Sequence, residues 1–371
     1  MKRFTIASAE ADPLARGGAL DLLRFLAAGF IVLYHYEAYA PLPFADIHPA
    51  LTRGHLGTDF FLMLSGYVLG RAYGRQVGEG RIGPAAFLTR RVARVWPGHL
   101  IVLAALALLV LGAGLAGLTL NNPHAFDWGA LPAHALLAQS WGLGVPYGWN
   151  TPTWSLSALI ICYAAFPLLW PVLQRLGGRG ALVAAVVLLA GCDLAARSVG
   201  IRFFDLAGEV GVLRALPLFI LGMALARYGA PAGLSLGAAR VVGLGALAGF
   251  LGLQLLGEFD LLSMLAIAVV VLMAGARTPP RTSDLVRRAA ELSFALYVTH
   301  SLVGMIWYRA LETVGVGLEG PLGWMVWSSG FPVAVLVAWL FHVVIDQPLQ
   351  NWIKPRLGRG PTPTRVALGV V

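Results

Sequence analysis

The stretch Leu20-Asp-Leu-Leu-Arg-Phe-Leu-Ala-Ala-Gly-Phe-Ile-Val-Leu-Tyr-His-Tyr-Glu37 forms the core of the first long apolar run, and Asp21, Arg24 and His35 interrupt it before it ends at Glu37. A charge inside a membrane helix costs about 2.5–3.5 kcal/mol on insertion scales, so Asp21, Arg24 and His35 indicate function. Arg24 and His35 are eleven residues apart. At about 100° and 1.5 Å per residue, they share one helix face and stand about 16 Å apart along it. The stretch therefore predicts a membrane helix with an arginine near one end and an imidazole deep inside.

The composition of the whole chain is that of a membrane protein. Of its 371 residues, 58% are hydrophobic and only 12% are charged, which predicts an all-α polytopic membrane protein. Apolar runs of spanning length predict about ten transmembrane helices, near Ala19–Tyr39, Leu56–Tyr73, Val95–Leu118, Trp154–Leu173, Ala181–Val199, Val210–Ala226, Val241–Gly257, Leu261–Ala276, Leu292–Leu311 and Trp324–Ile345.

Basic residues predict the orientation of these helices. Most of the 27 Lys and Arg residues fall in alternate short loops, which are cytoplasmic if the N-terminus is cytoplasmic. Both termini are therefore predicted to be cytoplasmic in a multi-pass protein of the cytoplasmic (inner) membrane. The net charge of +9 is explained by these loops, so nucleic-acid binding is not expected. The predicted division is a cytoplasmic segment at residues 1–18, a transmembrane domain at 19–349 and a disordered cytoplasmic tail at 350–371.

The longest outer connection, residues 119–153, is rich in tryptophan. Trp128, Trp141 and Trp149 lie in it, and Trp154 follows directly. These rings form either an aromatic belt at the membrane interface or a platform on which an acceptor such as a sugar ring stacks. The apolar run at 130–140 is too short to span the membrane, so it lies in the interface or re-enters the bilayer.

Further polar side chains interrupt later apolar runs. Asp59 and Ser65 lie in the second predicted span, and His300 lies in the ninth. A membrane-embedded Asp needs a partner such as Arg or His, whereas a Ser usually bonds the carbonyl four residues earlier. Arg91 and Arg94 lie three residues apart on one face, where they either bind phosphate groups or serve as a topology signal near anionic lipid.

Six short motifs follow one another along the chain: Arg24 with His35, the block Gly57–Gly66, Arg91 with Arg94 and Pro97, Trp154–Ser157, Leu296–His300, and Asp346-Gln-Pro348. In this order they resemble the acyltransferase 3 family of integral membrane O-acyltransferases, from Leu20 to about Leu349. One departure concerns the residue two positions after Trp-Ser-Leu-Ser, which is Leu159 here and Glu in many members of that family.

The resemblance implies transfer of an acyl group, expected to be acetyl, from cytoplasmic acyl-CoA to a hydroxyl of a carbohydrate or other envelope-facing acceptor. Acyl-CoA is then a co-substrate, and the acceptor and membrane lipids are the partners. No further cofactor is expected, and no metal site either, because no metal-ligand spacing is present. Arg24, Arg91 and Arg94 are candidates for binding the donor phosphates.

The expected catalytic residues follow from chemistry and position together. His35 is the candidate general base, and Asp59 is expected either to orient its imidazole or to hold Arg24. Ser65 is the candidate for a covalent acyl carrier, and His300 is either a second catalytic group or a buried histidine that donates to a carbonyl. Trp149, Trp154 and Ser155 are the candidates for contacting the acceptor.

Two other classes of protein compete with an enzyme. A multi-span transporter of a small solute would also use intramembrane charges such as Arg24, His35 and Asp59. The sequence shows no inverted repeat and no paired broken helices, which argues against a transporter. A scaffold protein would not explain why one face of the first helix carries both Arg24 and His35.

Overall fold

The computed structural model describes residues 18–118, 122–229, 234–257, 259–276, 283–317 and 320–357. These residues fold into helices, with no strand among them, which confirms the all-α prediction. The α-helices are α1 (Ala19–Tyr36), α2 (Phe44–Ile47), α3 (His55–Gly78), α4 (Pro84–Leu115), α5 (Leu131–Ala135), α6 (Trp154–Ser198), α7 (Gly211–Tyr228), α8 (Leu236–Leu256), α9 (Asp260–Ala274), α10 (Asp284–Thr313), α11 (Gly320–Ser328), α12 (Gly330–Phe341) and α13 (Gln347–Arg356).

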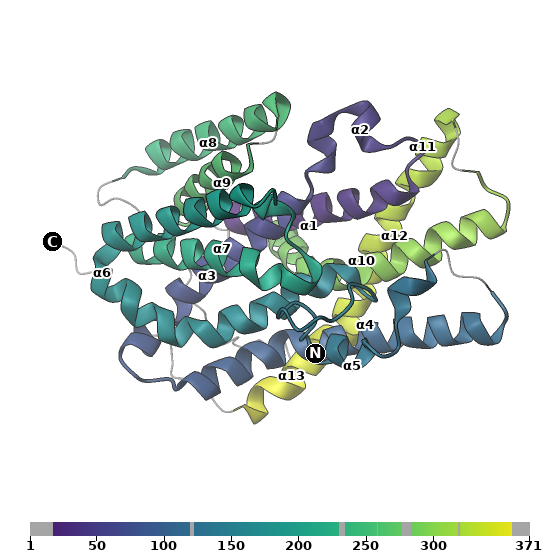
Figure 1. Cartoon of the computed structure of the whole chain (residues 1–371), viewed down its shortest axis with the longest axis horizontal. Coiled ribbons are helices and arrows are strands. Elements are labelled where there is room, and N and C mark those ends of the chain that lie inside the picture. Colours follow the sequence, from purple (N-terminus) through teal and green to yellow (C-terminus); the bar gives the residue numbers. More distant parts are fainter. Residues whose placement is uncertain are drawn as a thin grey trace, which may run out of the picture.

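The long helices form one bundle, in which α8 lies along one edge and α4 along the opposite edge (Figure 1). Seven helical segments in the described residues are long and apolar enough to cross a membrane, and α9 is a shorter apolar helix. Helix α6 covers two of the predicted segments. They are separated at Gly177, where φ is 69° and the backbone leaves the helical region. The chain is therefore a multi-pass helical membrane protein, while the count of ten spans and the cytoplasmic placement of both termini remain predictions.

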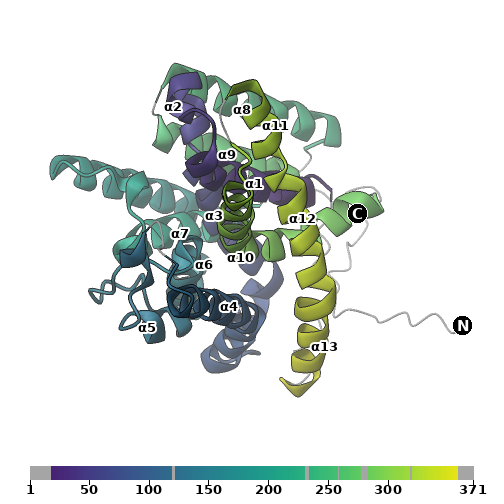
Figure 2. The same ribbon diagram turned by 90° about the vertical axis from the view of Figure 1, so that its right-hand side faces the viewer.

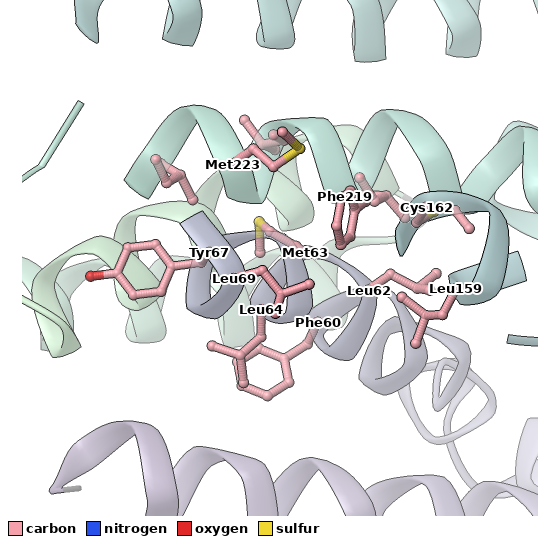
Figure 3. Packing of buried hydrophobic residues seen from close by; sticks show 14 of the residues in the cluster. Phe60, Leu62, Met63, Leu64, Tyr67, Leu69, Leu159, Cys162, Phe219 and Met223 are labelled. Atoms are coloured by element: carbon pink, nitrogen blue, oxygen red, sulfur yellow. The ribbon is translucent and has the colours of Figure 1, made fainter. Parts of the chain in front are cut away.

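Helix α3 packs at the centre of the bundle against α7. Gly66 and Gly222 make this packing close, because a Cβ at either position would overlap backbone atoms of the facing helix. Small residues commonly permit such close approach between membrane helices. Side chains of α3 such as Leu62 and Met63 are fully buried, and Figure 3 shows them beside Phe219 and Met223 of α7.

A second cluster of buried apolar residues joins α1, α10 and α12. Tyr36 at the end of α1 lies at its centre, with its ring 5.4 Å from that of Tyr308 and 5.5 Å from that of Phe331. Its hydroxyl donates to the backbone carbonyl of His300 at 3.0 Å. Figure 2 shows α12 and α13 running along one side of the bundle. This cluster fixes the end of α1 against the middle of α10.

The connection between α4 and α6, which is predicted to be an outer one, folds back onto the bundle. The Trp96 indole donates to the Ala135 carbonyl at 2.7 Å, and His99 Nε2 lies 2.8 Å from the His134 carbonyl. Trp96 and His99 are in the first half of α4, far along the helix from its end at Leu115. Of the two placements predicted for the run at 130–140, this contact favours re-entry.

The predicted terminal segments need one correction. Residues 350–356 belong to α13, so the predicted disordered tail starts inside a helix. An amide contact between Gln350 and α4 holds this helix in place. The rest of the predicted tail, and residues 1–17 of the N-terminal segment, lie outside the described residues.

Candidate active site

Two histidines from distant parts of the chain meet inside the bundle. His35 lies in the last turn of α1, and His300 lies in α10. Nε2 of His300 is 3.2 Å from Nδ1 of His35, and the two ring centroids are 5.0 Å apart. His300 is fully buried, whereas His35 is half-buried. Both predicted catalytic histidines therefore belong to one site.

Backbone carbonyls determine which ring nitrogens carry protons in this pair. His300 Nδ1 lies 2.8 Å from the Tyr297 carbonyl and 3.1 Å from the Leu296 carbonyl. A carbonyl only accepts, so this nitrogen must carry the proton, and Nε2 of a neutral His300 is an acceptor. His35 Nδ1 lies 2.9 Å from the Ile31 carbonyl and faces His300 Nε2, so it too must be the donor. Nε2 of a neutral His35 is then left with a free lone pair.

The His35 side chain is accessible from a shallow pocket at the end of α1. The lining residues are Tyr34, His35, Glu37, Ala38, Ala40 and Pro43. Glu37 is held in place by the backbone, because its Oε1 accepts from Phe44 N–H at 3.0 Å. His35 is therefore one of the residues that line this pocket.

The Trp-Ser-Leu-Ser segment packs directly beside the histidine pair. The Ser155 hydroxyl is 2.7 Å from the Tyr297 hydroxyl, which in turn donates to the Pro152 carbonyl. Asn150 donates to the Val298 carbonyl at 2.9 Å. The start of α6 therefore fixes the turn of α10 that carries His300.

The residues predicted to contact the acceptor are used inside the protein. Trp149 is buried, and its indole donates to the Asp127 carbonyl at 2.8 Å. Trp154 is also buried and lies under the Arg214 guanidinium, 5.4 Å from ring centroid to Cζ. With Ser155 engaged by Tyr297, none of the three presents a free surface, so the geometry gives the predicted acceptor-binding role no support.

The sequence predicts that Asp59 either orients His35 or holds Arg24, but the structure pairs it with Arg214 instead. It is fully buried, and Arg214 of α7 binds both carboxylate oxygens at 2.7 Å. Arg214 is 2% exposed and also donates to the carbonyls of Leu206 and His55, each at 3.3 Å. This bidentate pair locks α3 to α7.

Ser65 and Leu159 carry no catalytic geometry. The Ser65 hydroxyl donates to the Phe61 carbonyl four residues earlier, at 2.8 Å, as a membrane-helix serine usually does. Leu159 is buried in the apolar core, and Figure 3 shows it beside Leu62. The position of the family's glutamate therefore lies in the apolar core.

The predicted donor-binding arginines lie near the ends of their helices. Arg24 lies in the second turn of α1 and forms an ion pair with Asp21 at 2.8 Å, so Asp21 is its partner here. Arg91, in α4, donates to the Tyr73 hydroxyl at 2.8 Å and lies over the Tyr73 ring.

Arg94 connects the start of α4 to the C-terminal helices. Its Nη1 lies 2.8 Å and its Nη2 3.4 Å from the two carboxylate oxygens of Asp346. The guanidinium also stacks over Phe294, with Cζ 4.6 Å from the ring centroid. Asp346 ends a π-helical turn (His342–Asp346), an irregularity often found at functional sites. The side chain of Arg94 is 37% exposed, which leaves part of its guanidinium open to a ligand.

Two partners were missed when the sequence was considered alone. Arg214 is an arginine within a predicted span, which is a signal for a buried ion pair, but nothing in the sequence assigned it to Asp59. Gln350 lies beyond the last predicted span, at the first residue of the predicted tail. Long-range pairing of this kind depends on which helices become neighbours.

Comparison with known proteins identifies related chains. The family model described as an acyltransferase domain matches residues 18–343. The protein is 32% identical to "Protein 2 in picA locus" of Rhizobium radiobacter over 190 residues, which are 48% of this chain and 92% of that protein. It is 27% identical to the acyltransferase MdmB of Streptomyces mycarofaciens over 340 residues, which are 82% of this chain and 83% of that protein. No solved structure matches the chain.

Proposed function

The chain belongs to the acyltransferase 3 family, and from that premise we propose that it moves an acyl group from cytoplasmic acyl-CoA to a hydroxyl of an acceptor on the opposite side of the membrane. The chain is a membrane acyltransferase; the acetyl group, acyl-CoA and a carbohydrate or lipid-linked acceptor are the proposed substrates. The proposed location is the cytoplasmic membrane of the cell. The observation that carries the proposal is the His35–His300 contact, which leaves Nε2 of His35 as a base.

In the proposed step, His35 Nε2 takes the proton of the acceptor hydroxyl as its oxygen attacks the thioester carbonyl carbon. The carbon–sulfur bond breaks, and the CoA thiolate takes the proton back from His35. The products are the acylated acceptor and free CoA, so protons and charge balance. General-base catalysis of this kind contributes a factor of about 10² to 10⁴ in rate.

The phosphates of the donor are proposed to bind at the arginines rather than at the base. CoA carries several phosphate charges, and Arg91 and Arg94 lie near the start of α4. Arg24 lies near the start of α1, and a helix rise of about 1.5 Å per residue puts its Cα about 16 Å from that of His35. An extended pantetheine arm has a comparable reach, so phosphates at the arginines are compatible with a thioester beside His35.

The acceptor is proposed to enter through the pocket at the end of α1, which is lined by His35 and Tyr34. The transport alternative loses its main support, because Asp59 is fully engaged by Arg214 and forms no pathway with Arg24 and His35. We therefore propose acyl transfer alone.

The experiment supplies radiolabelled acetyl-CoA to purified protein in detergent, with vesicle-embedded protein as a second format. We expect release of CoA with wild-type protein, and loss of that release in His35→Ala and His35→Gln with thermal stability close to wild type. His124 is exposed in the outer connection, so His124→Gln is the matched control and is expected to keep full activity. A stable His35→Gln protein with most of its activity would refute the assignment of His35 as the base.

A further inference from the structure

Pro97 interrupts the hydrogen bonding of α4 one turn beyond Arg94. Proline has no N–H, so the carbonyl of Ala93, four residues earlier, loses its helical donor. Ala93 lines an apolar groove with Val92, Trp96 and others, where water is a poor substitute partner. A shielded carbonyl without a donor is costly, so another donor is expected there.

The side chain of Gln350 supplies that donor. Its Nε2 lies 3.1 Å from the Ala93 carbonyl and 3.2 Å from the Arg94 carbonyl. These are the two carbonyls that a proline at position 97 most disturbs. Gln350 is only 6% exposed, although it lies on a helix that is mostly exposed.

Asp346 lies four residues before Gln350, on the same helix face, and binds the Arg94 guanidinium. The C-terminal helix therefore holds both the backbone and the side chain of one turn of α4. We propose that Gln350 is a positioning residue of the donor site, which compensates the break at Pro97 and so fixes the direction in which Arg94 meets the phosphates of acyl-CoA. The inference rests on the donor role proposed for Arg94.

A purely structural contact would behave differently from a positioning contact. If Gln350 only held α13 to α4, its loss would lower stability without a specific effect on the donor. If it positions Arg94, its loss weakens donor binding while turnover at saturating donor changes little, because the proposed base His35 is held by Ile31 and His300. Restoring the missing N–H by Pro97→Ala should make the amide of Gln350 dispensable.

The test measures the Kd for radiolabelled acetyl-CoA and the rate of CoA release at saturation, on the full chain in detergent. We expect Gln350→Leu to raise the Kd about ten-fold, as expected for the loss of one buried hydrogen bond, with the saturated rate within about two-fold. Gln347 is exposed on the same helix, so Gln347→Leu is the matched control and should leave both values unchanged. In the Pro97→Ala background, Gln350→Leu should raise the Kd by less than about two-fold.

Equal Kd values for Gln350→Leu and Gln347→Leu would overturn the proposal, and so would an undiminished effect of Gln350→Leu in the Pro97→Ala background. Thermal unfolding of wild type, Gln350→Leu, Pro97→Ala and the double variant reports the contact without any donor, so it separates this proposal from the proposed function. If the unfolding temperatures show that Pro97 and Gln350 are coupled while Arg94→Ala leaves the Kd for acetyl-CoA unchanged, the donor site lies elsewhere. The positioning role of Gln350 is then overturned.

Discussion

In the histidine pair, backbone carbonyls and a second imidazole fix the tautomer of the proposed base His35. Backbone carbonyls of α10 fix the proton of His300 on Nδ1, and its Nε2 faces the N–H of His35. The second histidine thus does for the first what an aspartate does in many hydrolases: it holds one ring tautomer in place. Because His300 is neutral in this role, it adds no charge to an apolar environment.

We predict that His300→Phe keeps the fold but lowers the rate at saturating acetyl-CoA by about 10- to 100-fold, which is typical for the loss of a residue that orients a catalytic ligand. The donor Kd should change little, because the proposed phosphate ligand Arg94 contacts Phe294 and Asp346, whereas His300 contacts His35. The rate of His300→Gln should lie between that of His300→Phe and that of wild type, since an amide oxygen can accept a hydrogen bond from His35. A rate as low as that of His35→Ala would instead make His300 a direct participant.

The Asp59–Arg214 pair is predicted to stabilise the fold. Breaking a buried pair leaves one uncompensated charge and typically costs about 3–5 kcal/mol. We therefore expect Asp59→Asn and Arg214→Met each to lower the thermal unfolding temperature and the protein yield, whereas Asp59→Asn with Arg214→Met together should recover part of the loss. The control is Asp46→Asn, because Asp46 is exposed in α2. Full stability with complete loss of activity in Asp59→Asn would assign Asp59 to catalysis.

At the level of the element, helical segments were easier to predict than their partners. Nine of the ten apolar runs lie largely within a helix, because length and apolar content determine what fits a bilayer. The tenth, Trp324–Ile345, is divided among α11, α12 and the π-helical turn His342–Asp346. The Arg24–His35 spacing also survives, since α1 is one continuous helix. The partners of Asp59 and Arg94 were not predictable, because they depend on which helices pack together rather than on any local pattern.

The π-helical turn before α13 determines which face of that helix meets α4. A π-helical turn holds one residue more than an α-helical turn. Each later side chain is therefore rotated by about 100° around the helix axis. We predict that deletion of Val344 rotates Asp346 and Gln350 away from α4 and weakens acetyl-CoA binding at least as much as Arg94→Ala does. Val344 is exposed, so Val344→Ala is the control that keeps the length and should bind normally. Unchanged binding in the deletion variant would mean that α13 does not set the donor site.

At the scale of the whole molecule, the proposed donor site and the proposed base lie on different helices. The donor arginines are near the start of α4, and His35 is near the end of α1. Arg91 and Arg94 follow the short turn between α3 and α4, whereas His35 precedes the connection from α1 to α3. An enzyme that takes its donor from one side of a membrane and its acceptor from the other needs this separation. The proposed function therefore depends directly on topology.

We predict that the turn after α3 is cytoplasmic and that the outer connection and the turn after α10 face the opposite side, because basic residues cluster around the first and are sparse around the others. Reporter fusions truncated after Gly78, Pro123 and Gly315 test this directly. A fusion at Gly78 should be active only with a cytoplasmic reporter, and fusions at Pro123 and Gly315 only with an external one. The control is substitution of Arg90 and Arg91 by Ala, which should weaken the orientation signal without changing the helices. If two of the three fusions report the opposite side, His35 would face the cytoplasm and the donor arginines would not, so the direction of acyl transfer proposed above would have to be abandoned.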